Sequence, residues 1–179
     1  MKAPLVLDEA YVDFAPATGL DLVREGLPVI VTRSLSKGYA LAGLRFGYAV
    51  ADEALVRELE KVKDSYNCDA LSLAAAEAAL GDGEWLAETR AKVIASREHL
   101  ERGLAHLGFS VTPSQANFVW CRHPHHVAKT LFDGLKARNI FIRLMRYPGH
   151  ADGIRITVGT PEGTQRVLDT LADLMAKKV

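Results

Sequence analysis

Residues 27–50, LPVIVTRSLSKGYALAGLRFGYAV, decide the fold class of this chain. The stretch opens with an uninterrupted apolar run, residues 27–31, and a second apolar segment, residues 44–51, follows Gly43. Continuous apolar runs are typical of strands that are covered on both faces, whereas half-exposed strands alternate between apolar and polar residues. The stretch therefore predicts an α/β fold.

The same pattern occurs upstream, in PLVLDEAYVDF at residues 4–14, where an apolar run ends at Asp8. We therefore expect three strands in the first part of the chain, with polar or charged residues at their ends. In an α/β sheet the carboxyl ends of neighbouring strands meet at one edge. The polar residues that follow the strands are thus predicted to line one crevice.

The chain beyond residue 51 is predicted to form a helical stretch followed by an α+β unit. Helices are expected over residues 52–63, 70–81 and 84–107, because Asp52 is a suitable N-cap and Gly81 and Gly108 are suitable helix ends. The predicted elements after Gly108 are strands at 109–114 and 116–122, a helix at 125–139, strands at 140–145 and 153–159, and a helix at 160–178. We expect two domains, residues 1–90 and 91–179, with their boundary inside the long helix.

Charge and composition argue against several classes of function. Lys+Arg and Asp+Glu both number 22, so no excess charge predicts binding to nucleic acid or to a membrane surface. No apolar run approaches the roughly 20 residues of a membrane span. Cys68 and Cys121 lack metal or redox spacing, so we expect reduced thiols in a cytoplasmic protein. The histidines of CRHPHHVAK, residues 121–129, match no standard metal site, and no metal is expected.

A lysine that follows a buried strand, Lys37, is the candidate for covalent chemistry. A lysine amine reacts with aldehydes, and for the aldehyde of pyridoxal phosphate further groups are needed. These are a carboxylate for the pyridine nitrogen, a donor for the ring oxygen, and hydroxyls with an arginine for the phosphate. The candidates are Asp8, Tyr11, Ser34, Ser36 and Arg45. Each alone has an ordinary explanation as a cap, a chance tetrad or a surface ion pair, so the prediction rests on their combination.

Five segments together resemble the histidinol-phosphate aminotransferase group of the fold-type I pyridoxal-phosphate aminotransferases. The first two are the most specific: VLDEAYVDF at 6–14, and TRSLSKGYALAGLRFGYAVA at 32–51. The others are PSQANFVWCR at 113–122, IFIRLM at 140–145 and GIRITVGTPEGTQRVLDTL at 153–171. The resemblance implies part of a fold-type I large domain, with three strands plus helices, followed by a small α+β C-terminal domain.

The resemblance also implies a role for each candidate residue. Lys37 would attach the cofactor, pyridoxal 5'-phosphate, and would act as the general acid–base catalyst. Asp8 would bind the pyridine nitrogen and Tyr11 the ring oxygen. Ser34, Ser36 and Arg45 would bind the cofactor phosphate. Arg155, Arg143 and Asn117 would lie in the substrate pocket.

The implied reaction exchanges an amino group between histidinol phosphate and 2-oxoglutarate, in histidine biosynthesis. The partners would be this amino donor and this 2-oxo acid, and no nucleic acid or membrane. Because an arginine fork suits a carboxylate or a phosphate, a threonine-phosphate decarboxylase is the alternative enzyme. A non-catalytic fragment that serves only as an assembly domain is the alternative of another class.

The resemblance places this chain in the C-terminal half of the family's longer chain. That half lacks the backbone loop that cradles the phosphate, so we expect weak cofactor binding and impaired turnover. A homodimer, or a partner that carries the N-terminal half, would cover the exposed sheet. One departure is KDSYN at 63–67, in which Lys63 and Ser65 replace the arginine and the proline that are usual in the family.

Overall fold

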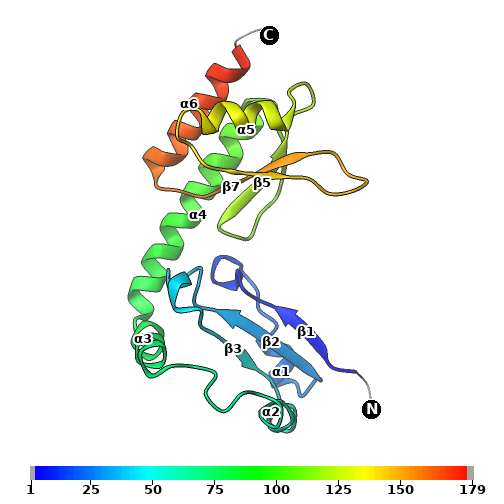
Figure 1. Cartoon of the computed structure of the whole chain (residues 1–179), viewed down its shortest axis with the longest axis vertical. Coiled ribbons are helices and arrows are strands. Elements are labelled where there is room, and N and C mark those ends of the chain that lie inside the picture. Colours follow the sequence, from blue (N-terminus) through cyan, green and yellow to red (C-terminus); the bar gives the residue numbers. More distant parts are fainter. Residues whose placement is uncertain (1–2, 177–179) are drawn as a thin grey trace. The chain divides into compact units, whose positions relative to one another are not determined.

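The structure is a computed structural model, and it describes residues 3–176. The chain forms two compact units that divide between Arg90 and Ala91, inside the long helix α4, Gly83–His106 (Figure 1). Each unit has its own sheet. Within the described residues, no helix is long and apolar enough to cross a membrane.

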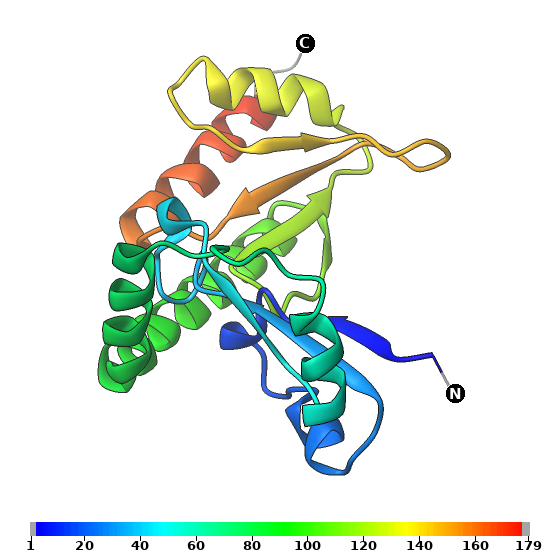
Figure 2. The same ribbon diagram turned by 60° about the horizontal axis from the view of Figure 1, so that its bottom comes forward.

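The first unit is built on a sheet of three strands in the order β1-β2-β3. The strands are β1 (Leu5–Asp8), β2 (Val29–Ser34) and β3 (Gly47–Val50). β1 and β2 are parallel, as the chain reaches β2 through the short helix α1 (Leu20–Arg24), whereas β2 and β3 are antiparallel (Figure 2). The sequence did not indicate α1, because five residues are too short to display a helical repeat.

Two further helices follow the sheet of the first unit. They are α2 (Glu53–Glu60) and α3 (Ala70–Gly81), and the 3-10 turns η1 (Val12–Phe14) and η2 (Ala42–Leu44) complete the unit. Asp52 caps α2 as predicted, because its carboxylate accepts a hydrogen bond from the Ala54 N–H at 2.9 Å. Asp69 caps α3 in the same way through the Ser72 N–H, also at 2.9 Å.

The second unit contains an antiparallel sheet of four strands in the order β4-β5-β7-β6. The strands are β4 (Ser110–Thr112), β5 (Phe118–Arg122), β6 (Arg143–Met145) and β7 (Gly153–Thr157). The helices are α4, α5 (Ala128–Lys136) and α6 (Pro161–Ala176). The predicted residues 177 and 178 of the last helix lie outside the described residues.

One face of this second sheet forms the core, and the helices cover it (Figure 1). Val119 and Cys121 of β5 contribute to this core, together with Ile154 and Ile156 of β7. Burial raises the pKa of the Cys121 thiol to about 12. Because side chains alternate along a strand, the intervening residues Trp120 and Arg155 lie on the opposite face. The predicted combination of an α/β part and a following α+β part is confirmed.

Candidate active site

The polar residues that end β1 and β2 lie at one edge of the first sheet. Asp8 is the last residue of β1 and Ser34 the last of β2, and the two strands run parallel. β3 runs the other way and begins with Gly47 opposite Ser34. Arg45, two residues before Gly47, therefore belongs to the same edge. The antiparallel direction of β3 is thus what gathers the three residues at this edge.

Lys37 lies three residues beyond β2 and is half-buried. Its Nζ lies over the ring of Tyr11, 5.5 Å from the ring centroid. A lysine ammonium at this distance from an aromatic face is attracted by the ring quadrupole. The structure therefore brings together Lys37 and Tyr11, which are distant in sequence.

The two serines shape the turn that carries the lysine. The Ser34 hydroxyl oxygen accepts a hydrogen bond from the Ser36 N–H at 3.1 Å. The hydroxyl proton of Ser34 is not used in this bond and remains available to an acceptor. Both serines are half-buried.

Arg45 adopts a left-handed backbone conformation, with φ of 56°, and its side chain is held locally. Its Nη1 donates a hydrogen bond to the Ala42 carbonyl at 2.9 Å. A left-handed conformation is strained for a residue with a Cβ, and such strain often occurs at functional sites. A cavity of about 400 Å³ adjoins Arg45 and is also lined by Asn67 and Ser72.

Two neighbouring carboxylates at this edge have different surroundings. Asp8 is exposed, and its carboxylate accepts a hydrogen bond from the Ala10 N–H at 3.0 Å. Glu9 accepts hydrogen bonds from the Thr18 hydroxyl, from the Gly19 N–H and from Arg33, whose Nη2 is 2.9 Å away. Burial alone would raise the pKa of Glu9, but these hydrogen bonds and the Arg33 charge outweigh burial and hold this pKa below its usual value.

The sequence interpretation did not include Glu9 and Arg33. One signal was available. Asp8 pairs with Thr32 in the register of β1 and β2, and the residues that follow these two, Glu9 and Arg33, carry opposite charges. The pair fastens the segment after β1 to β2. It thereby supports the positions of Asp8 and Tyr11.

The predicted substrate residues lie in the second unit, and two of them, Arg143 and Arg155, lie on the face of its sheet opposite the core. Arg155 of β7 is paired in register with Arg143 of β6 and with Trp120 of β5. The Arg155 guanidinium lies 4.8 Å from the Phe118 ring centroid. Its Nε is buried and has no hydrogen-bond partner within residues 3–176. Two like charges directly opposite one another destabilise a sheet, so this pair favours the binding of an anion.

Asn117 precedes β5 in a tightly held loop. Its carbonyl accepts a hydrogen bond from the Val158 N–H at 2.9 Å. The preceding carbonyl, of Ala116, accepts one from the buried Arg97 of α4, also at 2.9 Å. Arg97 is a positioning residue for this loop, and the sequence interpretation did not identify it.

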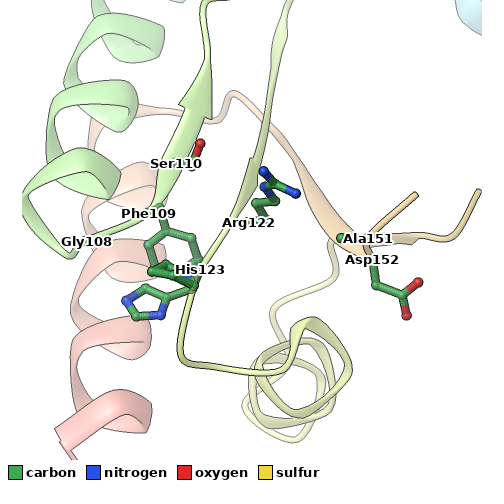
Figure 3. Close-up of a pocket in the computed structure, with 8 residues that line it drawn as sticks. Gly108, Phe109, Ser110, Arg122, His123, Ala151 and Asp152 are labelled. Carbon is green, nitrogen blue, oxygen red and sulfur yellow. The ribbon is translucent and has the colours of Figure 1, made fainter. Parts of the chain in front are cut away.

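A separate cavity of about 500 Å³ lies at the end of β5 in the second unit (Figure 3). Arg122, His123 and Asp152 are among the residues that line it, and none of the predicted site residues is. Burial, followed by the neighbouring His126 and His125, lowers the pKa of His123. In the part of the chain that the structure describes, no three His, Cys, Asp or Glu residues are arranged to hold a metal ion.

Comparison with known proteins identifies the family of the chain. Residues 1–171 match the family described as "Aminotransferase class I and II". The chain belongs to this family. The match covers both units, so the edge with Lys37 and the sheet with Arg155 are parts of one aminotransferase sequence.

Curated relatives and solved structures agree with this family. The chain is 52% identical to a histidinol-phosphate aminotransferase of Rhodopirellula baltica, over 90% of this chain and 45% of that protein. A histidinol-phosphate aminotransferase of Nostoc sp. is 47% identical, over 99% of this chain and 50% of that protein. The chain thus spans about half the length of the curated relatives that it matches.

Two solved structures show how widely the fold occurs among aminotransferases and related enzymes. The Sinorhizobium meliloti histidinol-phosphate aminotransferase, in complex with pyridoxal-5'-phosphate, has a TM-score of 0.81 and 30% identity, over 97% of this chain and 49% of that one. L-threonine-O-3-phosphate decarboxylase of Porphyromonas gingivalis has a TM-score of 0.82 and 26% identity, over 96% of this chain and 55% of that one. The predicted fold, part of a fold-type I large domain followed by a small α+β domain, is confirmed.

Proposed function

We propose that this chain carries the lysine-bearing part of a pyridoxal-phosphate-dependent aminotransferase that acts on histidinol phosphate and 2-oxoglutarate. The observation that carries this proposal is the sheet edge of the first unit. There a half-buried lysine faces an aromatic ring, beside a carboxylate, two hydroxyls and an arginine. The names of the relatives at 47–52% identity support the amino donor.

The residues at this edge fit the cofactor in charge. Arg45 carries a guanidinium fork and Ser34 retains a hydroxyl proton, so both suit a phosphate. The exposed carboxylate of Asp8 suits a protonated ring nitrogen. When bound, pyridoxal phosphate supplies an aldehyde carbon and a ring that accepts electrons from the substrate.

The residues of the chain supply binding and proton transfer. The Lys37 amine would hold the cofactor and would move a proton at its Nζ during the reaction. The Tyr11 ring, which faces the Lys37 amine, restricts the orientations of the lysine side chain. Asp8 would keep the ring nitrogen protonated, and Ser34, Ser36 and Arg45 would bind the phosphate.

The arginine pair of the second unit supports an anionic substrate. Arg143 and Arg155 are directly opposite in register, and the Arg155 Nε is buried without a hydrogen-bond partner among residues 3–176. Histidinol phosphate and 2-oxoglutarate are both anions, and each presents oxygens that an arginine fork binds. We assign Arg143, Arg155 and Asn117 to substrate binding.

A threonine-phosphate decarboxylase is the second candidate. The structural likeness to the Porphyromonas gingivalis enzyme supports it, and a phosphate-binding arginine pair serves either reaction. Product analysis distinguishes the two candidates. Glutamate formed without carbon dioxide indicates transamination, and carbon dioxide released from threonine phosphate indicates decarboxylation.

The proposal includes an assembly that completes the site. Leu5 and Val6 of the edge strand β1 are 53% and 59% exposed, and an exposed apolar edge strand favours pairing with another segment. The covering partner is either a second copy in a homodimer or a chain with the N-terminal half of the family. A cytoplasmic location belongs to the same proposal.

Covalent trapping tests the proposed function. The chain is incubated with pyridoxal phosphate, reduced with borohydride and mapped by mass spectrometry. We expect one label per chain, at Lys37, and its loss in Lys37→Ala but not in the control Lys136→Ala, which removes an exposed lysine of the second unit. Labels scattered over many lysines would refute a functional pocket and favour a non-catalytic assembly domain.

A further inference from the structure

The residue that follows Lys37 is in close contact with a carboxylate that the proposed reaction does not use. Gly38 is buried, and its N–H favours the charged form of the nearby Asp13 carboxylate and acts to lower its pKa. A Cβ placed on Gly38 would lie 2.3 Å from Asp13 Oδ2 and 2.6 Å from its Cγ. Asp13 therefore lies directly against the backbone that carries the lysine.

This contact lies next to the contact between Lys37 and Tyr11. Asp13 belongs to η1, which begins one residue after Tyr11. Two contacts therefore join the same two segments: the Lys37 amine lies over the Tyr11 ring, and the Asp13 carboxylate lies against Gly38. Together they restrict both the backbone and the side chain of Lys37.

The charges around Asp13 are compatible with an anchoring role. Burial raises the pKa of Asp13, while Arg33, the Gly38 N–H and Arg90 act in the opposite direction. Burial, followed by the neighbouring Asp13, raises the pKa of the Tyr39 hydroxyl. Asp13 is thus a half-buried carboxyl group influenced by two arginines, with its Oδ2 against Gly38.

We propose that Asp13 is a positioning residue for Lys37: by binding the Gly38 N–H, it fixes the direction from which the lysine amine meets an aldehyde. This proposal rests on the proposed function of Lys37. It also explains the need for glycine at position 38, because any Cβ there would displace Asp13.

The size of the effect follows from the flexibility of lysine. Its side chain has four rotatable carbon–carbon bonds, so a lysine that its surroundings do not restrict spreads its amine over many positions. A misplacement of about 1 Å can cost about 100-fold in the rate of a positioned reaction. We expect Asp13→Ala to slow attachment of pyridoxal phosphate to Lys37 about 10-fold, with the labelled residue unchanged.

The experiment compares the whole chain with three variants. Asp13→Ala removes the acceptor, and Asp13→Asn retains a side-chain oxygen for the Gly38 N–H. The control Asp21→Ala removes an exposed carboxylate that pairs with Arg24. Circular dichroism confirms that each variant is folded. The first measurement is the rate of borohydride-trapped labelling at Lys37. We expect the Ala variant to be slow, and the Asn variant and the control to be close to the parent.

A second measurement is independent of the cofactor. By NMR, we expect slow exchange of the Gly38 amide and a ring-current shift of the Lys37 ε-methylene protons, and Asp13→Ala should lose both. A parent chain with both signals but no label would refute the proposed function alone. Unchanged signals in Asp13→Ala, or a slow Asn variant whose Gly38 amide remains protected, would overturn the role of Asp13.

Discussion

Adjacent carboxylates in the sequence DEAY illustrate how the fold assigns roles to single residues. Asp8 is exposed at the strand end, where its charge is available to a ligand. The Glu9 side chain is only 11% exposed and pairs with Arg33, whose side chain is 21% exposed. Asp8 is therefore the carboxylate that we propose for the site, whereas Glu9 holds the segment in place.

Replacing Glu9 with glutamine should destabilise the chain in a pH-dependent way. The pKa of Glu9 is held below its usual value of 4.5, so the folded state favours the charged form. Its contribution to stability is fully present above that value and is lost as the pH falls through the folded-state pKa. We expect Glu9→Gln to lower the free energy of unfolding by about 2 kcal/mol at neutral pH.

Urea unfolding at several pH values measures this effect. The difference between parent and variant should shrink below pH 4.5. The matched control is Glu53→Gln, which breaks an exposed ion pair with Arg57 and should cost less than about 0.5 kcal/mol. A difference that does not depend on pH would contradict the assigned role of the Glu9 charge.

At the scale of elements, close helix packing in the second unit depends on small residues. A Cβ on Gly103 of α4 would lie 2.4 Å from Leu168 Cδ1 of α6. Leu168 and Leu104 are both part of the buried core. Glycine at position 103 therefore allows α4 and α6 to approach each other.

Gly103→Ala should lower the free energy of unfolding by about 1 kcal/mol. Overpacking costs about 1–3 kcal/mol, which exceeds the roughly 1 kcal/mol that alanine gains over glycine in a helix. The control is Gly163→Ala in α6, where the nearest atom to an added Cβ is Thr160 Oγ1 at 3.4 Å. This control should be neutral or stabilising in thermal unfolding, and a stabilising Gly103→Ala would contradict the packing argument.

At the scale of the whole molecule, the two units differ in how much core they contain. The largest buried cluster lies entirely in the second unit, between Leu100 and Leu171. The buried apolar residues of the first unit are fewer: Phe14, Val29, Val31, Leu35 and Ala76. The edge strand of the first unit also exposes Leu5 and Val6. The first unit is therefore expected to unfold locally more often than the second unit.

Hydrogen exchange on the full chain should separate the two units. We expect backbone amides of β5 and β7 to exchange at least about 10-fold more slowly than those of β1 and β2, because local opening follows the density of buried contacts. Mass spectrometry of peptides from each strand gives the rates. Equal protection in both units would show that the chain unfolds as one body and would contradict the proposed division at residue 90.

Much of this protein is determined by its sequence alone. The apolar run 27–31 indicated β2, Asp52 and Gly81 marked helix ends, and the position of Lys37 after a strand marked the candidate site. These features are local, because strand burial, capping and backbone freedom each depend on residues within a turn or a strand.

The tertiary structure decided the contacts between distant segments, which local sequence patterns do not specify. The antiparallel direction of β3 places Arg45 at the edge shared by Asp8 and Ser34. The pairing of Glu9 with Arg33 and of Asp13 with Gly38 joins segments more than twenty residues apart. Such contacts depend on strand order and register, which are set by the packing of whole elements and not by the sequence near either residue.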